Sequence, residues 1–137
     1  MDYRKFRSQR FWGHFFSVPF IWLPLLGLWL LDLMLTLYQA VCFPIYGLEK
    51  VKRSAYILVR DRNKLAYLEP LEKLGCMYCG YANGFLLYAK EVAGRTEKYW
   101  CGVMHEAKPG FKTQASQVEQ NFARFDDEKD FKKKYGD

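Results

Sequence analysis

Residues 19–41 decide the fold of this chain, and they read PFIWLPLLGLWLLDLMLTLYQAV. Leu, Ile, Trp and Phe dominate this run, and Asp32 is its one charged residue. A helix of this length, at about 1.5 Å per residue, crosses a hydrocarbon core of roughly 30 Å. The run therefore predicts a transmembrane helix, while Pro19 and Pro24 leave a kinked or re-entrant helix open as well.

Basic residues flank the apolar run on both sides, and the net charge of the chain is +6. Four of the first ten residues are Lys or Arg, and six more lie between Lys50 and Lys64. Cytoplasmic flanks carry an excess of Lys and Arg, so the larger number after the run predicts a cytoplasmic C-terminal part. The N-terminus then lies outside, or both ends lie inside if the helix is re-entrant. Membrane lipid is the expected partner of these basic flanks, and no recognition-helix pattern indicates nucleic acid.

The chain divides into three parts by composition. Residues 1–10 form a basic flank, residues 11–48 a membrane anchor, and residues 49–137 a charged part with room for one small domain. The anchor is too long for the core of a signal peptide, which is about 7–15 residues. Inside it, a charged Asp32 costs roughly 2.5–3.5 kcal/mol, so we expect Asp32 either to face protein, for which a partner membrane protein is one possibility, or to be neutral and hydrogen-bonded to a group such as Thr36.

The soluble part is predicted to be mainly α-helical with a short β element. Residues 54–60, SAYILVR, have the β-branched and aromatic content of a strand. Pro70 favours the start of a short helix that Gly75 ends, and residues 82–93 are apolar on one face as far as Gly94. Thr96 is placed to cap a further helix to about residue 106.

Two more helix signals follow Pro109. Ser116 and Glu119 form a capping-box pattern. Residues 126–128 are acidic and residues 132–134 are lysines, which is the order that a helix dipole favours.

The sequence predicts a metal site within this domain. Cys76 and Cys79 form a Cys-x2-Cys pair, and Cys101 and His105 lie four residues apart, which places them on one face of a helix. Three thiolates and one imidazole are a common closed set for structural zinc, so Cys76, Cys79, Cys101 and His105 are predicted to bind one ion together. Iron or an iron–sulfur cluster is the alternative metal, and a metal-free dithiol of Cys76 and Cys79 is the other alternative.

The stretch from Cys76 to His105 includes YCGYANG and YWC, followed by the histidine. It resembles a family of small uncharacterised bacterial membrane-associated proteins with a YCGYANG…YWC…H-like signature. This chain has Met104 where the family pattern has Lys. The resemblance implies that the four ligands belong together, and it implies no activity.

These patterns predict a non-enzymatic accessory or adaptor protein at the membrane. A closed four-ligand zinc site leaves no coordination position for a substrate, and the sequence has no catalytic triad, P-loop or dinucleotide fingerprint. Its zinc-stapled domain would face the cytoplasm and present a surface to a protein partner. The alternative function is an iron-containing electron carrier or a thiol-redox component at the membrane.

Overall fold

The computed structural model describes residues 10–136, and it is mainly helical, as the sequence predicts. Two long helices, α2 (Phe11–Tyr46) and α3 (Pro70–Trp100), make up about half of the chain. Two short helices follow, α4 (Ala115–Glu119) and α5 (Glu128–Tyr135). The segment between α2 and α3 contains two single 3-10 turns, η1 (Arg53–Ala55) and η2 (Arg62–Lys64). Most of the predicted basic flank, residues 1–9, lies outside the described residues.

The predicted strand over residues 54–60 is wrong. Residues 10–136 contain no strand, and their one β-bridge is an isolated parallel contact between Val103 and Ala123. Residues 54 and 55 belong to η1, and the residues after them pack across α3 at Gly80 and Gly84 rather than beside another strand. The apolar residues of this stretch contribute to the core instead, because Tyr56 and Ile57 pack against it.

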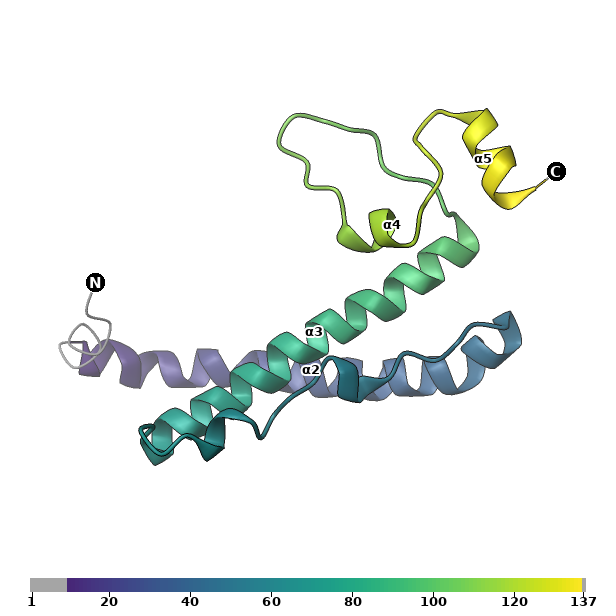
Figure 1. The fold of residues 1–137 in the computed structure, drawn as a ribbon. Coiled ribbons are helices and arrows are strands. Elements are labelled where there is room, and N and C mark those ends of the chain that lie inside the picture. Colours follow the sequence, from purple (N-terminus) through teal and green to yellow (C-terminus); the bar gives the residue numbers. More distant parts are fainter. Residues whose placement is uncertain (1–9, 137) are drawn as a thin grey trace.

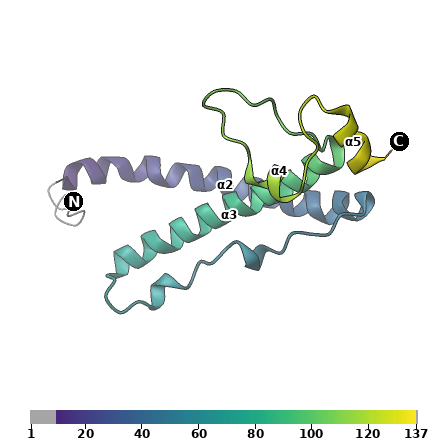
Figure 2. The same ribbon diagram turned by 45° about the horizontal axis from the view of Figure 1, so that its top comes forward.

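Helices α2 and α3 run in the same direction and cross each other at a shallow angle (Figures 1 and 2). Tyr78 near the start of α3 contacts Trp22, and Tyr99 near its end stacks on Tyr46. A parallel pair needs a connection that returns to the starting end. Residues 47–69, which we call the return segment, make that connection alongside α3.

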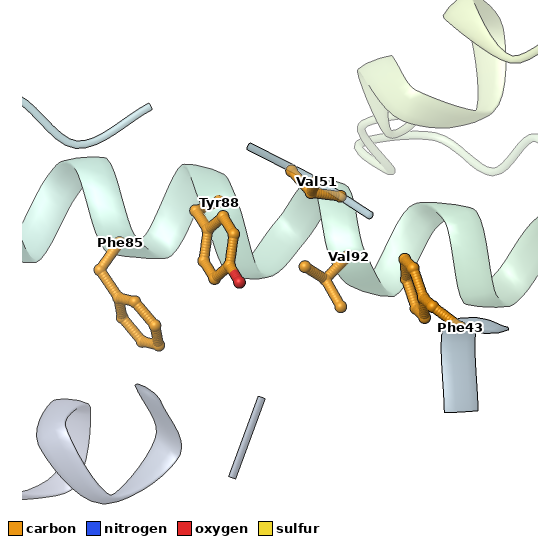
Figure 3. Packing of buried hydrophobic residues seen from close by; sticks show 5 residues of the cluster. All are labelled: Phe43, Val51, Phe85, Tyr88 and Val92. Atoms are coloured by element: carbon orange, nitrogen blue, oxygen red, sulfur yellow. The ribbon is translucent and has the colours of Figure 1, made fainter. Parts of the chain in front are cut away.

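The core lies where the two helices and the return segment meet. Its buried members are Phe43 of α2, Val51 of the return segment, and Phe85, Tyr88 and Val92 of α3 (Figure 3). Phe43 is fully buried, although it lies just after the apolar run that predicts the transmembrane helix. The C-terminal half of α2 is therefore part of the core.

Helix α3 is continuous where the sequence predicts three helices. Pro70 starts it as predicted, but neither Gly75 nor Gly94 ends it. Thr96 lies inside the helix, where its hydroxyl donates to the carbonyl of Val92 at 2.9 Å and does not cap an N-terminus. The helix ends at Trp100 rather than near residue 106.

The glycines of α3 are mostly contact positions. A Cβ atom at Gly80 or Gly84 would lie 2.6 Å from the carbonyl oxygen of Leu58 or 2.5 Å from that of Tyr56. A Cβ atom at Gly94 would lie 2.9 Å from the Cβ of Ser116 in α4. Glycine therefore lets the return segment and α4 approach the helix backbone.

The C-terminal part covers the end of α3 (Figure 1). Helix α4 forms near the predicted capping box, but Gln114 is its N-cap and Ser116 lies inside it. Helix α5 confirms the charge pattern: Asp127 accepts from the backbone N–H of Asp130, and three lysines occupy the last turn. Tyr135 donates to the carbonyl of Gly102 at 2.9 Å, which ties α5 to the chain just after α3.

Candidate functional site

The predicted metal ligands lie at opposite ends of α3. Cys76 and Cys79 are in its first three turns, one turn apart, and Cys79 is exposed. Cys101 directly follows the last residue of the helix and is also exposed. The helix between Cys79 and Cys101 is about 33 Å long at about 1.5 Å per residue.

His105 lies beyond the helix end and points toward a carboxylate. Its Nε2 is 3.8 Å from Oε1 of Glu97, and its ring meets that of Phe111 edge to face at 5.6 Å between centroids. Glu97 also accepts a hydrogen bond of 2.7 Å from Gln117 of α4. These contacts place His105 in the packing between α3 and the loop before α4.

The structure therefore does not bring the four predicted ligands together. Within residues 10–136 no three His, Cys, Asp or Glu side chains are grouped as metal ligands. The separation arises because α3 does not break between the two pairs, whereas the predicted site needs the chain to turn back near Gly94. Cys76 and Cys79, one turn apart on α3, share one helix face. Joint metal binding by all four stays a prediction from the sequence.

A three-way polar junction lies midway along α2. Asp32 accepts two hydrogen bonds from the Arg53 guanidinium, of which the one from Nη2 to Oδ2 is 2.8 Å long. The Tyr81 hydroxyl donates to the same Oδ2 at 2.8 Å. We call Asp32, Arg53 and Tyr81 the acidic junction, because its carboxylate links α2, the return segment and α3.

The acidic junction raises the pKa values of both groups that donate to the Asp32 carboxylate, Arg53 and Tyr81. Burial of the phenol, followed by its hydrogen bond to the Asp32 carboxylate, raises the pKa of Tyr81 to about 12. The hydrogen bond to the same carboxylate also raises the pKa of Arg53. The junction therefore keeps its charges across the physiological pH range.

Asp32 faces protein, as expected, but it does so through Arg53 and Tyr81 of the same chain. The hydroxyl of Thr36 donates to the backbone carbonyl of Asp32 at 2.8 Å and not to its carboxylate. The charge of Asp32 is met by Arg53 of the same chain, so a partner protein is not needed to neutralise it.

A second three-way junction, which we call the amide junction, lies one heptad further along. Gln39 is buried, its Nε2 donates to the Tyr88 hydroxyl, and its Oε1 accepts from the backbone N–H of Val51 at 2.7 Å. Asp32 and Gln39 are seven residues apart on α2, as Tyr81 and Tyr88 are on α3. Equal spacing on two parallel helices keeps both junctions on the contact line, as in a coiled coil.

The opposite face of α2 is apolar and uncovered. Seven side chains at intervals of three or four residues are each more than half exposed, and we call them the apolar stripe: Leu23, Leu26, Leu30, Leu33, Leu37, Val41 and Ile45. Nearer the N-terminus the exposed side chains include Phe11, Trp12, Phe16 and Phe20. By length and composition α2 is a helix that can cross a membrane, and it is the one such helix within residues 10–136.

The crossing of α2 and α3 leaves an apolar groove of about 550 Å³ on the surface. Leu35 and Tyr38 of α2 line one side, and Val92, Ala93 and Trp100 of α3 line the other, with Cys101 at the end. The groove lies far along α3 from Cys76 and Cys79. Of the four predicted metal ligands, only Cys101 lines this groove.

Sequence reasoning missed Arg53 and Tyr81, the two partners of Asp32. In the sequence Arg53 is one of six basic residues between Lys50 and Lys64, and nothing in the pattern around Tyr81 distinguishes it from the other aromatic residues. The heptad spacing of Asp32 with Gln39 was the available signal, since two polar residues seven apart on an apolar helix indicate one shared, protein-facing side.

Comparison of the chain with protein-family models, with curated proteins and with solved structures gave no match in any of the three.

Proposed function

We propose that this protein is a non-enzymatic accessory protein anchored to a membrane by α2, with the rest of the chain facing the cytoplasm. One observation carries the proposal. One face of α2 exposes apolar side chains along the whole length of the helix, from Phe11 at 66% to Ile45 at 73%. A water-soluble monomer rarely exposes a continuous apolar patch of more than a few hundred square ångströms, so this face requires lipid or protein to cover it.

The remaining features fit an adaptor role. Two junctions and a shared core fix α3 against the anchor, which gives a partner a rigid surface at the membrane. Leu86 and Leu87 of α3 are exposed, at 53% and 59%, and offer that partner an apolar contact. Exposed thiols such as Cys79 persist in the reducing cytoplasm, which supports the assignment of this side.

Fractionation tests the anchoring. We expect the full-length protein to sediment with membranes, to stay there in alkaline carbonate, and to dissolve only in detergent. Recovery in the carbonate supernatant would contradict the proposal, because apolar insertion does not depend on charge.

A thiol-redox role is the second candidate, and the placement of Cys76 and Cys79 favours it. They lie one helical turn apart and both are free thiols, while Cys101 is distant. Oxidation would form one S–S bond and pass two electrons and two protons to a small disulfide such as oxidised glutathione, which is released as two thiols. Thiol trapping after incubation in glutathione buffers of defined ratio tests this: a two-thiol loss that Cys79→Ser abolishes and Cys101→Ser does not supports the pair.

The zinc site that the sequence predicts, with iron as its alternative, gains no support from the placement of its ligands. The accessory role does not depend on it, because that role rests on the exposed apolar face of α2 and not on the predicted ligands.

A further inference from the structure

We infer that α2 enters one leaflet only and does not cross the bilayer, so that the apolar stripe rests on lipid and both ends of α2 lie on one side. The inference rests on the proposed anchoring function and makes it more specific. It commits α2 to a lipid surface as its partner, rather than to a second protein.

The first step is the length of α2 that precedes its contact with α3. Hydrogen bonds and ring contacts between the helices begin where the Tyr78 hydroxyl donates to the carbonyl of Ile21 at 2.7 Å and the Tyr78 ring meets that of Trp22 at 5.2 Å. Residues 11–20 lie before this point and are about 15 Å long, which is half of a hydrocarbon core of roughly 30 Å. The residues before Phe11 include four basic side chains and add no apolar length.

The second step is what lies against α2 after Ile21. The acidic junction holds Arg53 beside the middle of the helix, and the Arg53 side chain is 44% exposed. The amide junction follows one heptad later. A guanidinium at this exposure is costly inside hydrocarbon, so the covered side of α2 belongs in water or among headgroups.

The third step is the backbone of the return segment. Residues 57–59 belong to no helix or strand, and the carbonyls of Tyr56 and Leu58 face the helix at Gly84 and Gly80. No strand pairs with this segment within the described part of the chain. Irregular backbone exposed to lipid is not tolerated, so α3 and its return segment do not follow α2 through the bilayer.

The apolar stripe has the opposite character. It extends from Leu23 to Ile45 without a charged residue, on the side of α2 away from both junctions. A 36-residue helix is about 54 Å long, which exceeds the hydrocarbon core but suits a helix that lies obliquely along a surface.

Charges and aromatic rings at both ends of α2 match a lipid surface. Arg10 precedes the helix, and exposed Lys50 and Lys52 follow it, where anionic headgroups attract them. At the C-terminal end Tyr46, Tyr99 and Trp100 form one ring cluster, with Trp100 67% exposed. Tyr and Trp favour the headgroup level, so this end lies at the interface.

The orientation of the two ends tests the inference. Full-length protein with a protease-cleavable epitope at either terminus is placed in sealed inverted membrane vesicles and treated with an impermeant protease. We expect both epitopes to be cleaved without detergent. Protection of the N-terminal epitope alone would overturn the inference while leaving membrane anchoring intact, and loss of the protein from washed vesicles would overturn both.

The identity of the surface that covers the stripe is tested with purified protein and protein-free vesicles of phosphatidylcholine with phosphatidylglycerol. Leu37→Glu places a charge in the stripe at a 58% exposed position, and Leu58→Glu is the matched control, at 62% exposure on the return segment. We expect Leu37→Glu to weaken vesicle binding at least about tenfold, equivalent to about 1.4 kcal/mol, and Leu58→Glu to leave it unchanged. Equal binding of both variants, with helical content preserved, would show that something other than lipid covers the stripe and would overturn the inference.

Discussion

The carboxylate of Asp32 and the guanidinium of Arg53 form a two-point ion pair between residues 21 positions apart, in the middle of the most apolar helix of the chain. Through this pair, the one charged residue of the apolar run binds the return segment to α2. Tyr81 adds a third bond from α3, so one carboxylate connects three parts of the fold.

The first prediction follows from this pair. Asp32→Asn removes the negative charge but leaves Arg53 in place, so we expect a loss of about 1–3 kcal/mol in the free energy of unfolding. Arg53→Gln should cost a similar amount. The two losses should not add in the double variant, because each removes the same interaction. Denaturant unfolding in a mild detergent measures the cycle, and fully additive losses would show that the pair is not formed.

The second prediction separates two phenylalanines of α2. Phe43 is fully buried in the core, whereas Phe16 is 68% exposed. We expect Phe43→Ala to cost about 3–5 kcal/mol of folding free energy and to increase protease sensitivity of α3. Phe16→Ala should leave the unfolding midpoint unchanged and weaken membrane partitioning. Thermal unfolding and vesicle binding, measured on both variants, distinguish the two roles.

This difference also changes the expectation for a shortened chain. A division after residue 48 separates Phe43 and Gln39 from the core residues and hydrogen-bond partners that they contact in the rest of the fold. A fragment of residues 49–137 is therefore expected to be less stable than the full chain, although composition alone presents it as a separate domain. Circular dichroism of the fragment at increasing urea concentration checks this.

The third prediction concerns Asp130 in α5. The backbone N–H of Arg124, followed by the Lys134 ammonium, holds the pKa of Asp130 below its ordinary value. Because the pKa is lowered by folding, the contribution to stability is complete above the ordinary carboxyl pKa of about 3.9 and is lost as the pH falls through the lowered value. Asp130→Asn should remove this pH dependence and loosen α5.

The readout for Asp130 is its carboxyl chemical shift during an acid titration, with proteolysis of the C-terminus as the stability measure. Glu128→Gln is the control, since the Glu128 side chain is 77% exposed and pairs with Lys132 at the surface. A C-terminus equally resistant at neutral pH in Asp130→Asn and wild type would contradict the assigned role.

The fourth prediction concerns metal content. A joint site needs each of its four ligands, but a continuous α3 keeps Cys79 about 33 Å from Cys101. We expect Cys101→Ala to leave the metal content and the visible spectrum of the purified protein as they are in the wild type. Equal loss of zinc or iron in Cys76→Ala and Cys101→Ala would show that the ligands meet and that α3 breaks between them.

The sequence predicted the elements whose signals are local. The long apolar helix, the start of α3 at Pro70 and the charge order of α5 each depend on neighbouring residues, and the structure has them. The segment from Ser54 to Arg60 has the composition of a strand, but its apolar residues pack against a helix. A β-branched and aromatic run is suited to either kind of packing, so composition alone does not distinguish them. The partner of Asp32 was not predictable, since Arg53 reaches it only after the chain has reversed at Gly47.

The glycines of α3 likewise have a role that depends on distant parts of the chain and could not be predicted from neighbouring residues. Glycine favours helix ends, so Gly75 and Gly94 were interpreted as stops, yet both lie within α3. Gly80, Gly84 and Gly94 are needed by what packs on the helix, and a contact of this kind leaves no local pattern.

The last prediction tests those contacts directly. Gly80→Ala and Gly84→Ala would each place a methyl group about 2.5 Å from a backbone carbonyl of the return segment, which cannot move aside as a flexible side chain does. We expect each to displace the return segment, weaken both junctions and cost about 1–3 kcal/mol. Gly75→Ala is the matched control, because nothing lies within 4 Å of its Cβ position and alanine favours a helix by about 0.8–1 kcal/mol over glycine. Denaturant unfolding should therefore rank Gly75→Ala above the wild type and Gly84→Ala below it. If all three variants were stabilised alike, the return segment would not pack on α3 at Gly80 and Gly84. The irregular backbone of residues 57–59 would then no longer argue against a full membrane crossing.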